Sequence, residues 1–180
     1  MVDTKRTSTD LLTNLFQDGQ GANAISENDL RDFLVSLLQP YGGVEMEANA
    51  AETTINTINV YEVIAGTFTA TNLREVTVSA AGLFTYTGTP DRHFSLAANM
   101  SFEAAVSNKI IKFAWFKNGT VIPAETQHKI LVNTDINTLS VHSDITLVTS
   151  DTLQLKVANA TDNTNFTIVD FYAFIQGMFS

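Results

Sequence analysis

Residues 94–102 read FSLAANMSF, and this stretch decides the fold. Every second residue from Phe94 to Phe102 is apolar, whereas the residues between them are small and mostly polar. Successive side chains of an extended strand point to opposite faces of a sheet. The stretch therefore predicts a half-buried antiparallel strand that turns its apolar face to a core.

The same alternation recurs throughout the second half of the chain, and turn-forming Gly, Asn, Asp and Pro residues separate the alternating segments. About eight to ten short strands, with no helical pattern after residue 55, predict a mainly β protein, an antiparallel jelly-roll sandwich over residues 56–180. Parallel α/β architecture is excluded. The further strands are expected at Tyr61 to Ala65, Val76 to Val78, Leu83 to Tyr86, Ile111 to Trp115, Leu139 to Val141, Ile145 to Leu147 and Leu153 to Val157.

One amphipathic helix is predicted ahead of the strands, over residues 25–41. Ser26 is a good N-cap, and Asp29 stands three residues later, as the carboxylate of a capping box does. Pro40 ends the helix. Its apolar stripe needs a partner, which is either this chain's own β domain or copies of the chain or another protein around a symmetry axis. The stripe consists of Leu30, Phe33, Leu34, Leu37 and Leu38.

Residues 1–24 are interpreted as an extended N-terminal arm and residues 42–55 as a linker. The arm has a single apolar cluster, whose spacing allows one or two amphipathic turns. So short a segment is not stable as a helix alone. It either orders on contact with neighbouring subunits or a host surface, or remains a loose tail. The cluster consists of Leu11, Leu12, Leu15 and Phe16.

The last segment, residues 168–179, is apolar on both faces. A strand with one solvated face would alternate, but a strand between its own core and a neighbouring subunit need not. The segment therefore supplies the candidate oligomer interface. The alternative is an innermost strand that is buried within one subunit. The interface candidates are Phe171, Tyr172, Phe174, Ile175, Met178 and Phe179.

Composition argues against nucleic acid, thiolate-bound metals and membranes as partners. The net charge is −9 and only 10 residues are Lys or Arg, and these are scattered, so a phosphate-binding surface is not expected. There is no cysteine for disulfides or thiolate metal sites. No stretch approaches the roughly 20 apolar residues of a membrane span, and no leader pattern opens the chain. We expect synthesis in a cytoplasm and no membrane or nucleic-acid partner.

No catalytic, cofactor or metal site is expected. His93, His128 and His142 do not have the spacing of a metal-binding motif, so a metal site would have to be assembled from unrelated strands. The chain also lacks a nucleophile elbow, a phosphate-binding loop and a calcium-loop spacing. Three lysines lie near Trp115, but this tryptophan falls on an apolar stripe and is expected in the core. The chain is interpreted as a non-enzyme.

Four segments of the β region resemble the compact jelly rolls that are common in structural proteins of tailed bacteriophages. Those jelly rolls are similar to the trimeric ones of the complement-component and tumour-necrosis-factor superfamily. A second resemblance lies in residues 24–36, AISENDLRDFLVS, which look like the helix that precedes appendage or fibre domains of phage virion proteins. The four segments are LFTYTGT at 83–89, the strand at 94–102, FKNGTVI at 116–122 and VTSDTLQLKVAN at 148–159.

The two resemblances together imply a homotrimeric virion component. Its partners would be other virion proteins, either the major capsid protein or tail and neck components. The favoured function is a capsid decoration or cement protein that is anchored by its arm and helix. The alternative is a receptor- or glycan-binding module of a tail fibre or appendage, for which a host surface glycan is the partner. The resemblance does not fix the position on the particle.

Overall fold

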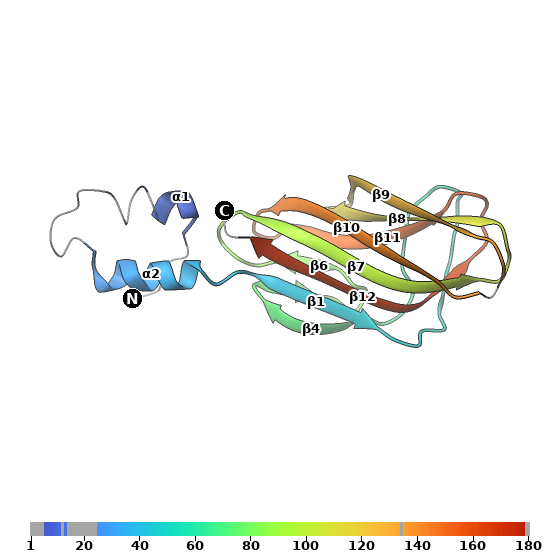
Figure 1. Ribbon diagram of the computed structural model, residues 1–180, viewed down its shortest axis with the longest axis horizontal. Helices are drawn as coiled ribbons and strands as arrows, with labels where there is room; N and C mark the ends of the chain where they lie inside the picture. The colour runs from blue at the N-terminus through green and yellow to red at the C-terminus, as the bar shows by residue number, and fades with distance from the viewer. Residues whose placement is uncertain (1–5, 12, 14–24, 134, 179–180) are drawn as a thin grey trace.

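The computed structural model describes residues 6–11, 13, 25–133 and 135–178. Two helices precede the strands, and the last strand ends beside the helical end of the molecule (Figure 1). The elements are α1 (Ser8–Asp10), α2 (Glu27–Ser36), β1 (Tyr41–Met46), β2 (Glu52–Thr53), β3 (Glu62–Val63), β4 (Thr69–Arg74), β5 (Val76–Val78), β6 (Phe84–Tyr86), β7 (Arg92–Ala104), β8 (Lys109–Lys117), β9 (Thr120–Ile130), β10 (Asn137–Leu147), β11 (Thr152–Asn159) and β12 (Phe166–Met178).

The strands form two sheets that pack face to face. One sheet has the order β10-β7-β12-β1-β4, with β2 paired to β12, and the other has the order β5-β6-β11-β8-β9, with β3 paired to β11. Every pairing is antiparallel. The predicted antiparallel jelly-roll sandwich is confirmed.

The core lies between the two sheets and confirms the alternation that predicted it. In β7 the even-numbered residues from Phe94 to Phe102 are buried, and the odd-numbered ones face outward. Phe102 packs against Phe113 of the opposite sheet with ring centroids 5.1 Å apart. Trp115 is fully buried, as expected. Buried side chains of this kind contribute roughly 1.5–3 kcal/mol each, so the sandwich has a substantial core of its own.

The sandwich begins earlier than the sequence predicts. Residues 42–55 are not a linker, because β1 and β2 lie within or at the edge of this range and β1 is held between β12 and β4. The sequence does not predict this strand, because two of its six residues are glycines, which are uncommon in strands. A Cβ on Gly42 would stand 2.8 Å from Val76 Cγ1, so the close approach of β5 needs a residue without a side chain.

Helix α2 starts as predicted but is shorter than residues 25–41. Ser26 Oγ accepts a hydrogen bond from the Asp29 N–H at 3.2 Å, and Asp29 Oδ2 accepts one from the Ser26 N–H at 2.8 Å, which completes the capping box. The bonds that Asp29 Oδ2 accepts, first from the Ser26 N–H and then from the Ser26 hydroxyl, lower the pKa of Asp29. The helix ends at Ser36, and Tyr41 already belongs to β1.

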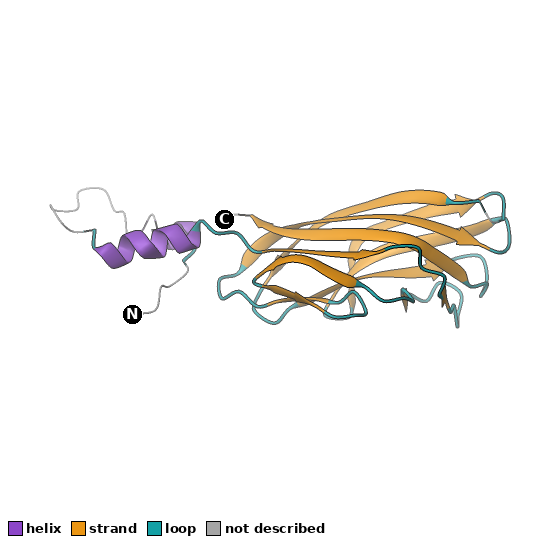
Figure 2. Ribbon diagram, turned by 90° about the horizontal axis from the view of Figure 1, so that it is seen from below, coloured by secondary structure: helices purple, strands orange, loops and turns teal. Residues whose placement is uncertain are grey.

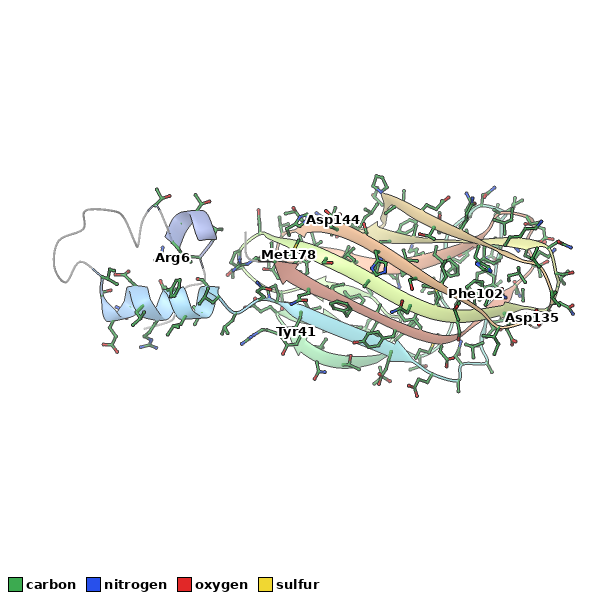
Figure 3. The ribbon with its side chains drawn as sticks, viewed as in Figure 1. Arg6, Tyr41, Phe102, Asp135, Asp144 and Met178 are labelled. Carbon is green, nitrogen blue, oxygen red and sulfur yellow. The ribbon has the colours of Figure 1, made fainter. Side chains whose placement is uncertain are left out.

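The helical part projects from one end of the sandwich along its long axis (Figures 1 and 2). The opposite end is formed by loops that include residues 105–108, 131–133, 135–136 and 160–165 (Figure 1). Figure 3 shows Arg6 at the helical end and Asp135 at the far end. Among the residues that the structure describes, no helix has the length and apolarity to cross a membrane.

Candidate interaction surfaces

The apolar stripe of α2 is the first surface that the fold leaves uncovered. Leu30 is 51% exposed and Leu34 is 54% exposed, while the buried residues of this helix are the polar Asp32 and Ser36. Leu37 and Leu38 follow the helix and are 44% and 41% exposed. The β domain therefore does not cover the stripe, which was one of the two alternatives. Only Phe33 of the predicted set is half-buried.

The described part of the N-terminal arm contacts the polar flank of α2 instead. The Arg6 backbone N–H donates to Ser36 Oγ at 2.8 Å, and Arg6 Nε donates to Asp32 Oδ2 at 3.0 Å. Arg6 Nη1 also donates to Asp10 Oδ2 at 2.9 Å. These carboxylates, Asp10 first, raise the pKa of Arg6. Leu11, from the predicted arm cluster, is buried, whereas Leu12, Leu15 and Phe16 lie outside the described residues.

Two contacts join α2 to the sandwich. Arg92, which is 1% exposed at the start of β7, donates from Nη2 to the Ser36 carbonyl at 3.1 Å. A cation is favourable there because the last carbonyls of a helix carry partial negative charge. On the other side of the joint, the Gly177 N–H donates to the Pro40 carbonyl at 2.8 Å. The direction in which α2 leaves the sandwich is therefore fixed by a buried charge and a strand contact.

The second uncovered surface is the face of the β10-β7-β12-β1-β4 sheet that is turned away from the core, called the open face below. Tyr172 stands between Glu45 and Asn99 in the strand register and is 47% exposed. Phe174 stands between Gly43 and Ala97, and these small neighbours leave its ring half-buried. Aromatic side chains in this setting are typical of protein interfaces.

The open face is hollowed on both sides of Tyr172. A groove of about 720 Å³ lies over β1, β7, β10 and β12, and a smaller one of about 410 Å³ lies over β1, β4 and β12. Asp170, in the larger groove, accepts hydrogen bonds from the Ala48 N–H at 3.0 Å and from Ser101 Oγ at 2.8 Å. These bonds, the one from Ala48 first, lower the pKa of Asp170. Its carboxylate thus fixes the turn after β1.

The candidate interface of β12 divides between the two faces of the sheet. Phe171 and Ile175 are 5% and 0% exposed and belong to the sandwich core, so the expectation that they contact another subunit is wrong. Their side chains are covered because alternate residues of β12 point inward. Tyr172, Phe174 and Met178 point to the open face and remain candidates. Phe179 lies outside the described residues.

A third uncovered surface lies at the far end of the sandwich and had no signal in the sequence. Leu131 and Ile136, in the β9–β10 loop, are 65% and 64% exposed. Val132 in the same loop and Val106 in the neighbouring β7–β8 loop are 53% and 45% exposed. Isolated apolar residues in loops have no periodicity, so sequence analysis treats them as ordinary loop residues. Four of them at one end form an apolar tip.

The three histidines, all among the described residues, lie apart from one another. His93 Nε2 lies 3.0 Å from Asp144 Oδ2 on the open face, and His128 Nε2 lies 3.0 Å from Asn137 Oδ1. His142 is exposed on β10. Within the described part of the chain, no three His, Asp or Glu residues are placed to hold a metal ion together.

Comparison with known proteins gives likenesses of fold only. No family model matches the sequence, and no curated protein matches it. Among solved structures, the chain is similar to Eiger TNF from S. frugiperda, with 9% identity, a TM-score of 0.47 and coverage of 78% of this chain and 95% of that one. It is also similar to murine APRIL, with 10% identity, a TM-score of 0.45 and coverage of 77% and 99%.

Proposed function

We propose that this chain is a non-enzymatic, homotrimeric structural protein of a phage virion that decorates or cements the capsid, with α1 and α2 as its attachment end. It would be synthesised in the host cytoplasm and work on the particle. One observation carries the proposal. The sandwich completes its own core, yet the chain leaves an apolar helix stripe and an aromatic sheet face uncovered.

The open face supports self-association. It presents Tyr172, Phe174 and Met178 on a strand in the middle of a sheet, where a second copy of the chain would cover them. Among the register neighbours of Tyr172 and Phe174 only Glu45 is charged, and the others are Asn99, Ala97 and Gly43. Aromatic residues with mostly uncharged neighbours are typical of an interface core.

The helical end supports attachment. It stands outside the sandwich and is tied to it by Arg92 and Pro40, so force on the arm would be transmitted to the β domain. An attachment that binds only the assembled lattice stabilises that lattice by mass action. Three arms on one trimer also raise the effective concentration for the second and third contacts.

The test measures occupancy of the protein on expanded capsids, with and without residues 1–39. The β domain is expected to fold without them, because its buried cluster begins at Val44. We expect loss of capsid binding and retention of the trimer. Undiminished occupancy after the deletion would contradict the attachment role, and a stable monomer of the intact chain at micromolar concentration would contradict the homotrimer.

The apolar tip favours a second candidate, a receptor- or glycan-binding module of a tail fibre or appendage. The tip lies at the end opposite α2, where a host surface would be met if α2 faces the particle. For this function, the intact protein should bind host cells, and the double change Leu131→Ser with Ile136→Ser should abolish binding. Leu73→Ser on β4, also an exposed leucine, is the matched control. Binding only to capsids would exclude this function.

A further inference from the structure

The exposed leucines of α2 have the spacing of a coiled-coil seam. Leu30, Leu34 and Leu37 follow each other at intervals of four and three residues, which are the d, a and d positions of a heptad. They are also the three most exposed apolar residues from Glu27 to Leu38. A leucine row with this spacing is typical of helices that pack against other helices.

The side of α2 opposite this seam is already occupied. With Leu30 at d, Asp32 takes position f and Ser36 takes position c, both on the outer side of a coiled coil. These are the residues that Arg6 binds, at 3.0 Å and 2.8 Å, and they are buried by the arm. The described part of the arm thus lies on the outer flank, and Leu30, Leu34 and Leu37 are exposed.

The residues beside the seam indicate more than one neighbouring helix. The half-buried Phe33 takes position g, and Leu38, counted on from the end of the helix, takes position e; these positions are often Glu or Lys in two-stranded coils. Apolar residues there widen the stripe beyond what one neighbour covers. A seam with this width fits a bundle of three helices better than a pair.

The joint with the sandwich determines how copies would meet. Pro40 leads directly into β1, which belongs to the sheet with the open face, and Arg92 holds the end of α2. Copies related by a threefold axis in front of that face would project their helices in parallel from the same end. A ten-residue helix is too short to associate alone, but tethering to an assembled β domain supplies the effective concentration.

We propose that the α2 seams of three copies pack together as a parallel three-helix bundle at the attachment end of the trimer. The inference rests on the homotrimer of the proposed function. It identifies a second and third copy of this chain as the partner of the leucines. The surfaces that remain for the capsid are then the arm and the outer flank of α2, rather than the leucine stripe.

The chain has no cysteine, so single cysteines report directly on this geometry. Leu34→Cys places a thiol at the central a position, and Asn28→Cys places one at the exposed b position of the same helix as a matched control. A disulfide requires Cα atoms within about 7 Å, which the seam allows and the outer side does not. Full-length variants are oxidised mildly at several concentrations, and the same samples are examined by sedimentation.

The bundle predicts a characteristic yield of disulfide-linked dimers. Only two of three thiols in one layer can pair, so about two-thirds of Leu34→Cys chains should become disulfide dimers, independently of concentration, within a species that sediments as a trimer. Asn28→Cys should remain uncrosslinked. A trimer in which Leu34→Cys crosslinks no faster than Asn28→Cys would overturn the bundle and leave the homotrimer intact. A monomer without crosslinks would overturn both.

Discussion

Asp151 holds together the end of the sandwich from which α2 projects, and its replacement by alanine should be costly. The side chain is 7% exposed. Its Oδ1 accepts a hydrogen bond from the Asn118 amide at 2.6 Å, and its Oδ2 accepts one from the Val148 N–H at 2.8 Å and contacts Lys117 Nζ at 2.8 Å. One carboxylate therefore joins the β8–β9 turn to the β10–β11 turn.

The expected loss follows from these contacts. A hydrogen bond to a charged group contributes about 1.5–3 kcal/mol, and breaking a buried ion pair by removing one partner costs about 3–5 kcal/mol. The contributions overlap, and Lys117 is partly exposed and also donates to the Thr146 carbonyl, so it keeps a partner. We therefore expect Asp151→Ala to lower the free energy of unfolding by about 3 kcal/mol, which is about 6–12 °C in Tm for a chain of this size.

The assay is thermal and urea unfolding at one fixed protein concentration, because oligomerisation makes stability concentration-dependent. Asp144→Ala is the matched control: its carboxylate also contacts a nitrogen-bearing side chain, His93 Nε2 at 3.0 Å, but is 71% exposed, and its loss should cost less than about 0.5 kcal/mol. Equal effects of the two variants would refute the reasoning that burial of the Asp151 network decides its contribution.

The same network predicts a pH dependence. Burial alone would raise the pKa of Asp151, but the Lys117, Val148 and Asn118 donors outweigh it and the pKa is lowered. A carboxyl with a lowered folded-state pKa stabilises the protein above its unfolded pKa of about 3.9, and this contribution is lost as pH falls through the folded value. The difference in free energy of unfolding between wild type and Asp151→Ala should therefore have its full value at about pH 6 and become smaller as the pH falls towards about 3.

Three further predictions concern other contacts. Gly177→Ala should destabilise the protein by about 1–3 kcal/mol in thermal unfolding, because its Cβ would lie 2.5 Å from the ring of Pro40; an unchanged Tm would contradict this packing. The hydrogen bond from Lys109 lowers the pKa of Asp162 to about 2, so part of the free energy of unfolding should be lost as the pH falls from about 4 to about 2. In urea unfolding, Asp162→Asn should lose less stability than wild type over this range, and an equal loss in both proteins would count against the role of Asp162. Asn49→Ala should cost about 1–3 kcal/mol in urea unfolding, since the Asn49 amide donates to three backbone carbonyls, and a loss below about 0.5 kcal/mol would mean that water replaces them.

Those parts of the fold with strong local signals were predictable from the sequence. The alternation of β7 and the capping box of α2 are encoded in neighbouring residues, so both appear in the structure as expected. The strand β1 was missed because residues 41–46, YGGVEM, follow a proline and contain two glycines, which resemble a helix stop and a linker. Only the distant β5 explains why Gly42 stands in a strand.

The candidate surfaces were predictable only in part. The leucine stripe of α2 was identified from helical spacing, but the sequence did not show whether the sandwich would cover it. In β12, apolar residues on both faces could not be separated until the register placed Phe171 inward and Tyr172 outward. The apolar tip depends on the β7–β8 and β9–β10 loops, which cross between the two sheets at the same end of the sandwich. Local pattern does not encode that proximity.

The placement of α2 and the β7–β8 loop at opposite ends makes this molecule a natural display scaffold. Residues 105–108 connect β7 to β8 at the end remote from the helices, while the last strand returns to the helical end. A foreign peptide inserted into this turn would lie at the end of the sandwich that is farthest from α2 and from the joint at Pro40. A fusion after the last strand would lie beside the helices and obstruct them.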